Sequence, residues 1–553
     1  MHTRSAAIIL LILYHFAFSG ETIRLNSLGF LPPSPKKATI TAECSRFEVK
    51  NLQGRTVLRG NVSGPHQQHD VNQTVWIADF SKLKKPGNYY LEIADDRSAP
   101  FTVAENVYDF AFVTAMRAMY LWRCGTAVEG EHNGQIYSHA ACHLNDGYED
   151  RLGRPDVIRD GTGGWHDVGD HGKYVVNAGI TVGTMFLAWD HFQQQIEKHP
   201  LHLPETAPGY PEFLKELKWE IDWLLKMPYP DGSGRVSHKL TRTNFAGFIM
   251  PEDDDGKRFF TVWSSAATAD FVAMTAMAAR YFKPYDAVYA QACLDAALKS
   301  YEYLKNNPQD EPFRQGDFRT GAYGTHDADD RIWAAAELWE TTGDPVYLAD
   351  FERRVRDNKP QTRRGEAAPS DVRLIDDDWD WGNVRNLGAF TYLLSKRSDK
   401  DPELLQKLKN DLPASADAIV DQAQKDVYGR PSARYYWGCN GTVARQTLNL
   451  QIAYRFSPRK EYRNACLDAI AHLFGRNVYG RSFVTGLGID PPMHPHDRRS
   501  GADGIEAPWP GYIVGGGHSA TGWVDEEASY ATNEVAINWQ AALIYALAGF
   551  ISH

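Results

Sequence analysis

The period of the apolar residues changes near residue 105, and this change divides the chain into two parts. Before it, apolar residues lie in short runs rich in β-branched and aromatic side chains, separated by Gly and Pro turns. About seven such runs are typical of the strands of a small β-sandwich. After it, apolar residues recur every three to four positions, which is the period of an amphipathic helix. We therefore expect a β-sandwich over residues 21–104 and a helical domain over residues 105–553.

The helical part contains about twelve periodic runs and almost no strand signal. They lie near residues 107–122, 172–195, 210–226, 261–282, 286–306, 328–342, 346–355, 383–396, 402–423, 443–456, 460–474 and 530–549. An even dozen helices suits either a solenoid or a closed ring of six helical hairpins. Because the sequence shows no repeat of fixed length, we expect the closed ring, an (α/α)6 barrel.

The composition is that of a folded, water-soluble protein, with 43% hydrophobic and 23% charged residues. These fractions exclude a disordered chain, a collagen-like fibre and a multi-span membrane protein. The net charge of −11 argues against nucleic-acid binding, because contact with phosphates needs a basic excess. The 15 Trp, 27 Tyr and 25 Phe fit either core packing or a surface that stacks on sugars, and we expect the second.

Residues 1–20 have the pattern of a secretory signal peptide, with basic His2 and Arg4 before an apolar run over residues 6–18. This run is too short to span a bilayer core of roughly 30 Å comfortably. The alternative is an N-terminal membrane anchor. We expect a secreted protein, extracellular or periplasmic, with no membrane association after removal of the signal peptide.

The segment GGWHDVGDHGKY, residues 163–174, holds two carboxylates three positions apart, Asp167 and Asp170. Glycines bend the chain here, and the helical run that follows places Asp170 at or near a helix N-terminus. Free N–H groups and the helix dipole lower the pKa of a carboxyl at that place, as a general base requires. The other interpretation is a plain N-cap residue.

Two later segments also concentrate groups able to do chemistry. Residues 493–517 place His494, His496, Arg498 and Arg499 within six positions, which fits either a binding surface for a polar ligand or an ion-pair patch. Residues 523–539 contain a second group of carboxylates, namely Asp525, Glu526, Glu527 and Glu534.

Glu534 is the best candidate for a general acid in that second group. It lies beside the apolar start of the last helical run, and like charges with aromatic neighbours favour the protonated form. The alternative is a solvated, charged helix face. Two separate carboxylate clusters fit a glycoside hydrolase better than either cluster does alone.

Cys124, Cys142, His143 and His166 offer two thiolates and two imidazoles, the ligand set of a closed zinc site. Their spacing is not that of a zinc finger, so a Cys124–Cys142 disulfide with two incidental histidines is the alternative. Four protein ligands leave no open position, so such a zinc ion would be structural. It would pin the loop that carries Asp167.

Together these segments resemble the family-nine glycoside hydrolases, a group with many cellulases, in the subset with an N-terminal immunoglobulin-like module. The likeness covers nearly the whole chain after the signal peptide. The motifs that carry it are IRLNSLGFLP (23–32), GGWHDVGDHGKY (163–174), DWDWGNVRNLGAFTYLLS (378–395), YYWGCNG (435–441), FGRNVYGRSFVTGLG (474–488), His-x-Arg (496–498) and Asn-Glu-Val (533–535).

The resemblance implies an (α/α)6 barrel and an inverting endo-β-1,4-glucanase. It places the base that activates water on Asp170, its assistant on Asp167 and the proton-donating acid on Glu534. A further functional aspartate falls on Asp525. Inversion needs the two main carboxyls roughly 6.5–9.5 Å apart, so that a water fits between them.

The family's His-x-Arg motif implies that His496 and Arg498 contact the sugar, and we expect Trp437, Tyr530 and Trp379 to bind the glucan beside them. Many members of the family have a second histidine directly after the first. This chain has Asp497 at that position, so any role of the second histidine has no counterpart here.

The resemblance also implies metals. It favours zinc at the two cysteines and two histidines and adds a calcium ion, with Asp503, Ile505, Asp525 and Glu526 as candidate ligands. We expect no organic cofactor.

Four other interpretations of the function stay open. The enzyme could be an exo-acting cellodextrinase or β-glucosidase of the same family, because blockage of the cleft by loops decides this. An exo-β-glucosaminidase is less favoured, since the Asp loop lacks the Ser-Lys-Tyr form found in members that act on chitin-derived sugars. A non-catalytic carbohydrate-binding protein and a zinc-dependent hydrolase are disfavoured, because base and acid are both present and the zinc ligands are complete. We expect a monomer.

Overall fold

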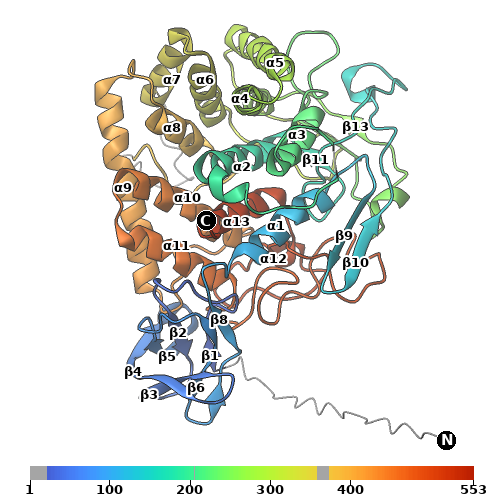
Figure 1. Cartoon of the computed structure of the whole chain (residues 1–553). Helices are drawn as coiled ribbons and strands as arrows, with labels where there is room; N and C mark the ends of the chain where they lie inside the picture. The colour runs from blue at the N-terminus through green and yellow to red at the C-terminus, as the bar shows by residue number, and fades with distance from the viewer. Residues whose placement is uncertain (1–21, 205, 358–372) are drawn as a thin grey trace, which may run out of the picture.

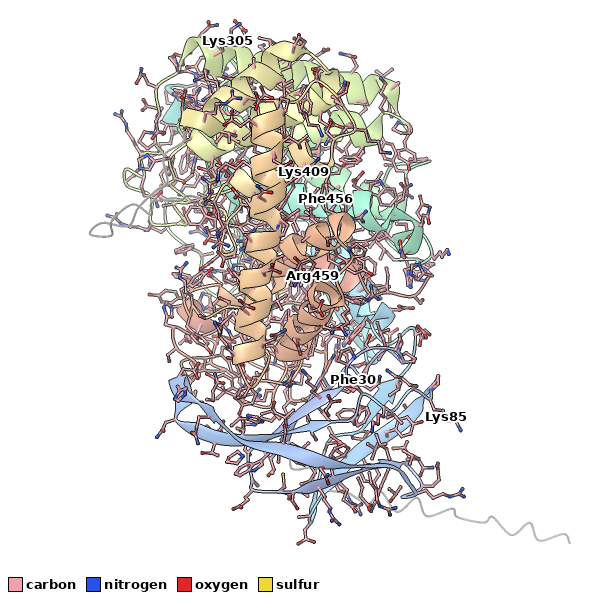
Figure 2. The ribbon with its side chains drawn as sticks, turned by 90° about the vertical axis from the view of Figure 1, so that its left-hand side faces the viewer. Phe30, Lys85, Lys305, Lys409, Phe456 and Arg459 are labelled. Atoms are coloured by element: carbon pink, nitrogen blue, oxygen red, sulfur yellow. The ribbon has the colours of Figure 1, made fainter. Side chains whose placement is uncertain are left out.

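The structure is a computed structural model that describes residues 22–204, 206–357 and 373–553. The predicted signal peptide, residues 1–20, lies outside the described residues. A β-sandwich lies against one end of a mainly helical domain (Figures 1 and 2). No helix of the described residues combines the length and the apolar character needed to cross a membrane.

The β-sandwich holds eight antiparallel strands in the described residues, in the order β1-β2-β5-β4-β3-β6-β7, with β8 paired to β6. They are β1 (Ile23–Arg24), β2 (Lys37–Ile40), β3 (Arg46–Asn51), β4 (Thr56–Gln68), β5 (Gln73–Asp79), β6 (Gly87–Ile93), β7 (Asp96–Arg97) and β8 (Phe101–Val103). The long strand β4 belongs to both layers, because its first half pairs with β3 and its second half with β5. Between the layers, the rings of Phe30, Phe80 and Phe101 pack with centroids 5.2–5.4 Å apart.

The helical domain is an (α/α)6 barrel, as predicted (Figure 1). The inner helices are α2 (Val175–Ile196), α4 (Ser265–Phe282), α6 (Ala328–Thr342), α8 (Arg385–Leu394), α10 (Cys439–Phe456) and α13 (Ile537–Ala548). The outer helices are α1 (Asp109–Leu121), α3 (Glu212–Leu224), α5 (Ala287–Asn306), α7 (Pro345–Asp357), α9 (Pro402–Lys425) and α11 (Lys460–Leu473). Inner helices are buried on almost every side, which explains their nearly continuous apolar sequence.

The joint between α8 and α10 is bridged by a single backbone oxygen. The carbonyl of Asp376 accepts hydrogen bonds from Asn386 on α8 at 2.8 Å and from Asn449 on α10 at 2.7 Å. Buried backbone groups need such partners, so these two asparagines help to hold α8 and α10 together.

The last predicted helical run, near residues 530–549, is broken. Its first turn is α12 (Tyr530–Asn533), α13 begins at Ile537, and Glu534 between them is extended, with φ −73° and ψ 156°. Val535 and Ala536 instead make isolated bridges to Val514 and Val168. Long-range pairing therefore overrides the helical period here.

The long loops contain short strands and single-turn helices. The hairpin of β9 (Val128–His132) and β10 (Gln135–His139) follows α1, and β11 (Lys173–Tyr174), β12 (Lys239–Thr241) and β13 (Phe259–Phe260) form a three-stranded sheet. The 3-10 helices are η1 (His69–Val71), η2 (Asp150–Leu152) and η3 (Pro251–Asp253). The three-stranded sheet joins the end of the Asp167 loop to the segment between α3 and α4.

Hydrogen bonds link the β-sandwich to the barrel. In Figure 2 helix α9 runs toward the sandwich, and beyond its end the Asp426 carboxylate accepts a hydrogen bond from Gln68 of β4 at 2.9 Å. Nearby, Ser27 donates to the carbonyl of Phe474 through its backbone N–H, at 3.0 Å, and through its hydroxyl, at 2.6 Å. The two domains therefore share a polar contact surface.

Candidate active site

Asp170 lies in a turn shortly before α2, near the helix N-terminus but not in its first turn. The helix begins at Val175, five positions later. The Asp170 carboxylate accepts hydrogen bonds from the backbone N–H of Gly172 at 2.5 Å and from the hydroxyl of Tyr174 at 3.0 Å. The turn and the tyrosine orient this carboxylate, and an effect of the helix dipole on it stays a prediction.

Asp167 is fully buried below Asp170. Its Oδ1 accepts a hydrogen bond from Asn177 of α2 at 2.6 Å, and its backbone carbonyl accepts from Ile537 of α13 at 2.9 Å. Burial raises the pKa of Asp167 to about 8, and the negative charge of Asp170 adds to this shift. Asp167 therefore carries a proton at neutral pH, which makes it a hydrogen-bond donor.

Glu534 is held at the break between α12 and α13, with 9% of its surface exposed. Its carbonyl accepts from Gly515 at 2.9 Å, and the carbonyl of Asn533 accepts from His496 at 2.8 Å, so the extended backbone is fixed on both sides. Burial raises the pKa of the Glu534 carboxyl well above its usual value, and the charge of Asp170 adds to the effect. Glu534 is thus poised to donate a proton.

Asp170 and Glu534 line the same cavity, of about 360 Å³. Apolar and aromatic side chains form most of its wall, and the sequence analysis did not predict six polar side chains that also line it: Tyr323, Asp380, Tyr436, Thr442, Arg445 and Asn538. Tyr323 has φ of 44°, a left-handed conformation that a bulky residue rarely adopts and that is found at functional sites. Asp380 lies inside a motif quoted for the family resemblance, whereas no sequence signal points to Tyr323.

Three aromatic rings at the site are exposed, namely Trp437 (44%), Tyr530 (54%) and Phe245 (45%), and the first two have ring centroids 5.3 Å apart. Trp437 lines the cavity, as does Trp381. Trp379 is only 3% exposed, and its indole N–H donates to Asn449 at 3.0 Å. The prediction that Trp379 binds the glucan was therefore wrong, because this ring packs inside the barrel.

Most of the other tryptophans near the acidic motifs are buried as well. At most 4% of their surface is exposed in Trp165, Trp509 and Trp523. Most of these tryptophan rings therefore pack in the core or beneath the long loops, and few of them form an open surface that could stack on sugars. The aromatic wall of the cavity is smaller than the composition indicated.

Arg498 holds the loop that carries Asp170. Its guanidinium donates to the carbonyl of Gly169 at 2.6 Å and to that of Ala246 at 2.9 Å. Gly169 must stay small, because a Cβ there would lie 1.9 Å from the carbonyl oxygen of His496. The His496 ring is bonded through Nδ1 to the carbonyl of Glu527 at 2.6 Å. Contact of either residue with a sugar stays a prediction.

Asp525 lies near Glu534 and binds backbone N–H groups there. Among the described residues, it does not line the active-site cavity. Its carboxylate accepts from the N–H groups of Met493 and His494 at 2.9–3.1 Å, from Arg481 at 2.7 Å and from Asn533 at 3.2 Å. Burial alone would raise its pKa, but these donors lower it overall. Asp525 therefore stays charged and positions the residue before Glu534.

The candidate calcium ligands do not come together as side chains. Asp503 accepts from the N–H of Ile505 at 2.9 Å and from the indole of Trp509 at 2.8 Å. In the described residues, neither group of side chains able to hold a metal includes Asp503, Asp525 or Glu526. Calcium binding stays a prediction, with no set of ligands assigned to it.

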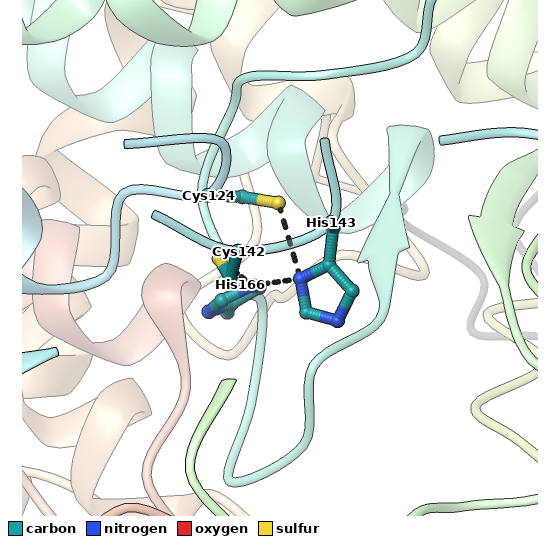
Figure 3. A group of neighbouring side chains, drawn as sticks. All are labelled: Cys124, Cys142, His143 and His166. Carbon is teal, nitrogen blue, oxygen red and sulfur yellow. Dashed lines mark hydrogen bonds between the residues drawn. The ribbon is translucent and has the colours of Figure 1, made fainter. Parts of the chain in front are cut away.

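Cys124, Cys142, His143 and His166 place one ligand atom each within 4.8 Å of one another (Figure 3). The measured separations are 3.6 Å from Cys124 Sγ to His143 Nδ1, 3.9 Å from Cys142 Sγ to His166 Nε2, and 3.4 Å between the two imidazole nitrogens. In a tetrahedral zinc site, bonds of about 2.3 Å to sulfur and about 2.0–2.1 Å to nitrogen imply about 3.5 Å between sulfur and nitrogen. Both cysteines are free thiols, so the disulfide alternative was wrong.

A buried carboxylate supports this cluster from behind. Asp254 lies 3.3 Å from His143 Nε2, the nitrogen that faces away from the cluster, and 3.3 Å from His171 Nδ1. A carboxylate on the outer nitrogen fixes the ring orientation of a metal-ligating histidine. Asp254 is 111 residues from His143 in sequence, so no spacing signal could have identified it.

The cluster is tied to the Asp167 loop through backbone as well. Cys124 N–H donates to Gly164 at 2.8 Å, and His166 N–H donates to Trp122 at 2.9 Å. His166 directly precedes Asp167 in sequence. The cluster therefore holds the backbone directly before Asp167.

Comparison with known proteins gives two family matches. The glycosyl hydrolase family 9 model matches residues 108–547, and the cellulase N-terminal ig-like domain model matches residues 19–98. Endoglucanase D of Acetivibrio thermocellus is 57% identical over 535 residues, which cover 96% of this chain and 83% of that protein. A cellodextrinase of Butyrivibrio fibrisolvens is 30% identical over 96% of this chain and all of its own length.

One solved structure matches nearly the whole chain. The crystal structure of a Zn-binding triple mutant of the family 9 endoglucanase J30 matches with a TM-score of 0.86 and 30% identity, covering 94% of this chain and 99% of that one. The likeness extends over both domains of this chain.

Proposed function

Because the chain belongs to glycosyl hydrolase family 9, we propose that it is an inverting endo-β-1,4-glucanase that cleaves cellulose-type glucans and cello-oligosaccharides. It is a glycoside hydrolase by family membership and by its likeness to Endoglucanase D. The single observation that carries the mechanism is the shared cavity, in which an oriented carboxylate, Asp170, faces the same space as Glu534, a buried carboxyl whose pKa burial raises.

In this mechanism Asp170 takes a proton from a water molecule, and the water oxygen attacks the anomeric carbon. Glu534 gives its proton to the glycosidic oxygen as the bond from that oxygen to the anomeric carbon breaks. Attack from the face opposite the leaving group inverts the configuration. Protonated Asp167 supports the reaction by hydrogen bonding in the neutral form, while Arg498 holds the Asp170 loop against Gly169.

Product analysis tests this activity. We expect cellohexaose to be cut at internal bonds, to release products that are initially α-anomers, and carboxymethyl cellulose to lose viscosity quickly. The relative described as a cellodextrinase favours an exo-acting enzyme as the second candidate. Release from chain ends alone, with little loss of viscosity, would support that candidate, and β-anomeric products would rule out inversion.

We also propose that the cysteine–histidine cluster holds a structural zinc ion. Its ligand atoms have the chemistry and the separations of a closed tetrahedral site, and Asp254 supplies the outer hydrogen bond. With all four positions filled by protein, zinc would cross-link the loop and supply no chemistry to the substrate. The signal pattern of residues 1–20 supports export, and we propose that the enzyme acts as a secreted monomer on soluble or solid glucan.

Removal of the metal should weaken the fold first. We expect a strong chelator, or Cys142→Ser, to remove about one zinc per chain and to lower the Tm by about 5–10 °C, because a closed zinc site contributes folding free energy directly. The matched control is Cys44→Ser, which changes a free cysteine in the β-sandwich and should keep both zinc and Tm. Metal analysis measures the zinc content, and calorimetry measures the Tm. Loss of activity at an unchanged Tm would contradict a structural role.

Two tryptophans that lie in family motifs should behave in opposite ways. Trp437→Ala removes an exposed cavity ring, so we expect KM for cellotetraose to rise about ten-fold, ~1.4 kcal/mol, with the Tm unchanged. Trp379→Ala empties a core position and should cost about 3–5 kcal/mol of stability. Steady-state kinetics and denaturant unfolding separate the two. The assignment of Trp437 fails if its variant loses stability while KM stays the same.

A further inference from the structure

A second cavity lies between helix α1 and the β9–β10 hairpin, on the outer side of the barrel. Its volume is about 190 Å³, and it shares no described lining residue with the active-site cavity. The hairpin packs beside α1 (Figure 1), and Pro510 of the long loop before α12 completes the wall. Nothing in the proposed catalytic mechanism uses this place.

One wall of the cavity is an aromatic platform. Phe110 is 62% exposed, although it is a large apolar side chain, and its ring stacks on the His132 ring with centroids 5.7 Å apart and an interplanar angle of 20°. His132 is itself buried, and its Nε2 is bonded to the carbonyl of Gly486 at 2.8 Å. The histidine therefore fixes the phenyl ring from one side and leaves its other face open.

The rim of the cavity carries charges of both signs. In the part of the chain that the structure describes, no hydrogen bond or ion pair is made by the Arg117 guanidinium, which has five N–H groups to donate. Glu131 and Asn133 lie on the hairpin side, and the Glu131 carboxylate accepts from Gly134 N–H at 3.1 Å. Gly130 lies close to helix α1, because a Cβ there would be 3.2 Å from Leu121 Cδ2 and in ordinary contact, 3.6 Å, with Arg117 Nη2.

These features define the chemistry of the ligand. A carboxylate and a guanidinium at one rim favour neither an anion nor a cation, but together they match a neutral molecule with vicinal hydroxyl groups, which both donate and accept. The open phenyl face matches the apolar C–H face of a pyranose ring. A volume of about 190 Å³ is below the roughly 300–1,000 Å³ of pockets for drug-sized ligands, so it suits a single ring.

We propose that this cavity is a secondary saccharide-binding site that holds one glucose unit of a β-glucan outside the catalytic cavity. The identity of the glucan rests on the proposed function, whereas the preference for a neutral saccharide rests on the cavity itself. Such a site raises the local concentration of enzyme on a polymeric substrate, and it adds to the binding of the catalytic cavity when both engage one particle.

The experiment compares Phe110→Ala and Arg117→Ala with the parent, each in a Glu534→Gln background that prevents cleavage. We expect both to reduce retention on insoluble cellulose at least five-fold. The matched control is Phe456→Ala, which removes an exposed phenyl ring, 44% exposed, at the end of α10 and should leave retention unchanged. With Glu534 restored, the Phe110 and Arg117 variants should cleave soluble cellotetraose at the parental rate.

The outcomes separate this proposal from the proposed function. Unchanged retention in both variants overturns the secondary site, even if the parent cleaves cellotetraose normally. A shift of the sedimentation coefficient by Phe110→Ala, with retention unchanged, identifies the surface as a contact between copies of the chain and also overturns it. If Phe110→Ala lowers the Tm, Arg117→Ala and the conservative Phe110→Tyr, which should retain binding, decide the matter. Failure of the parent to cleave cellotetraose counts against the proposed function alone.

Discussion

The Glu534→Gln variant is expected to lose about 10²–10⁴-fold in kcat on cellotetraose, the range that general acid catalysis supplies. Gln keeps the volume of the side chain but has no acidic proton for the glycosidic oxygen. Burial holds the pKa of Glu534 well above its usual value, so the parent keeps this proton to a higher pH than an ordinary glutamic acid does and loses activity as the pH rises through that raised pKa. Steady-state kinetics and a pH profile of kcat measure both effects.

A substrate with an activated leaving group sharpens this test. A dinitrophenyl glycoside departs without protonation, so Glu534→Gln should retain much more of its activity on such a substrate than on cellotetraose. Glu526→Gln is the matched control, because it makes the same exchange on an exposed carboxylate eight positions earlier in the segment. It should equal the parent on both substrates. Equal losses of the Glu534 variant on both substrates, or a lowered Tm, would contradict its role as the acid.

The sequence was sufficient to predict the two-domain architecture, because the change of apolar period is a local property. Inner helices α2 and α10 show almost continuous burial, and outer helices α7 and α9 show one apolar face, as expected for a two-layer ring. The break at Glu534 could not be predicted in the same way. It depends on bridges from Val535 and Ala536 to Val514 and Val168, and the second of these spans more than 300 residues.

In the active site, too, the sequence predicts local features but not contacts between distant segments. Sequence motifs identified Asp170 and Glu534, and the structure places both on one cavity. They could not show that Tyr174 and Gly172 orient Asp170, or that Asp254 stands behind His143, since these contacts depend on how loops meet in space. Trp379 was misjudged because a tryptophan inside a motif looks the same whether its ring faces a ligand or a core.

The Asp170→Asn variant should lose activity to a similar extent, about 10²–10⁴-fold in kcat, because an amide cannot take the proton of the attacking water. Asp167→Asn is the matched control, and here a much smaller loss is expected. Burial raises the pKa of Asp167 to about 8, so the parent side chain is already neutral below that pH, and Asn reproduces its charge and its shape. Kinetics on cellotetraose at pH 6 compare the two variants directly.

A second, independent prediction concerns how the residual activity of the Asp170→Asn variant depends on pH. After burial, the negative charge of Asp170 is the largest cause that raises the pKa of Glu534, so removal of this charge should lower that pKa. Deprotonation of the acid then begins at lower pH, and the alkaline limb of the kcat profile should move toward neutral pH. A parental alkaline limb would show that the two carboxyl groups are not coupled through the cavity. Equal losses in Asp167→Asn and Asp170→Asn would instead mean that Asp167 works as a charged base.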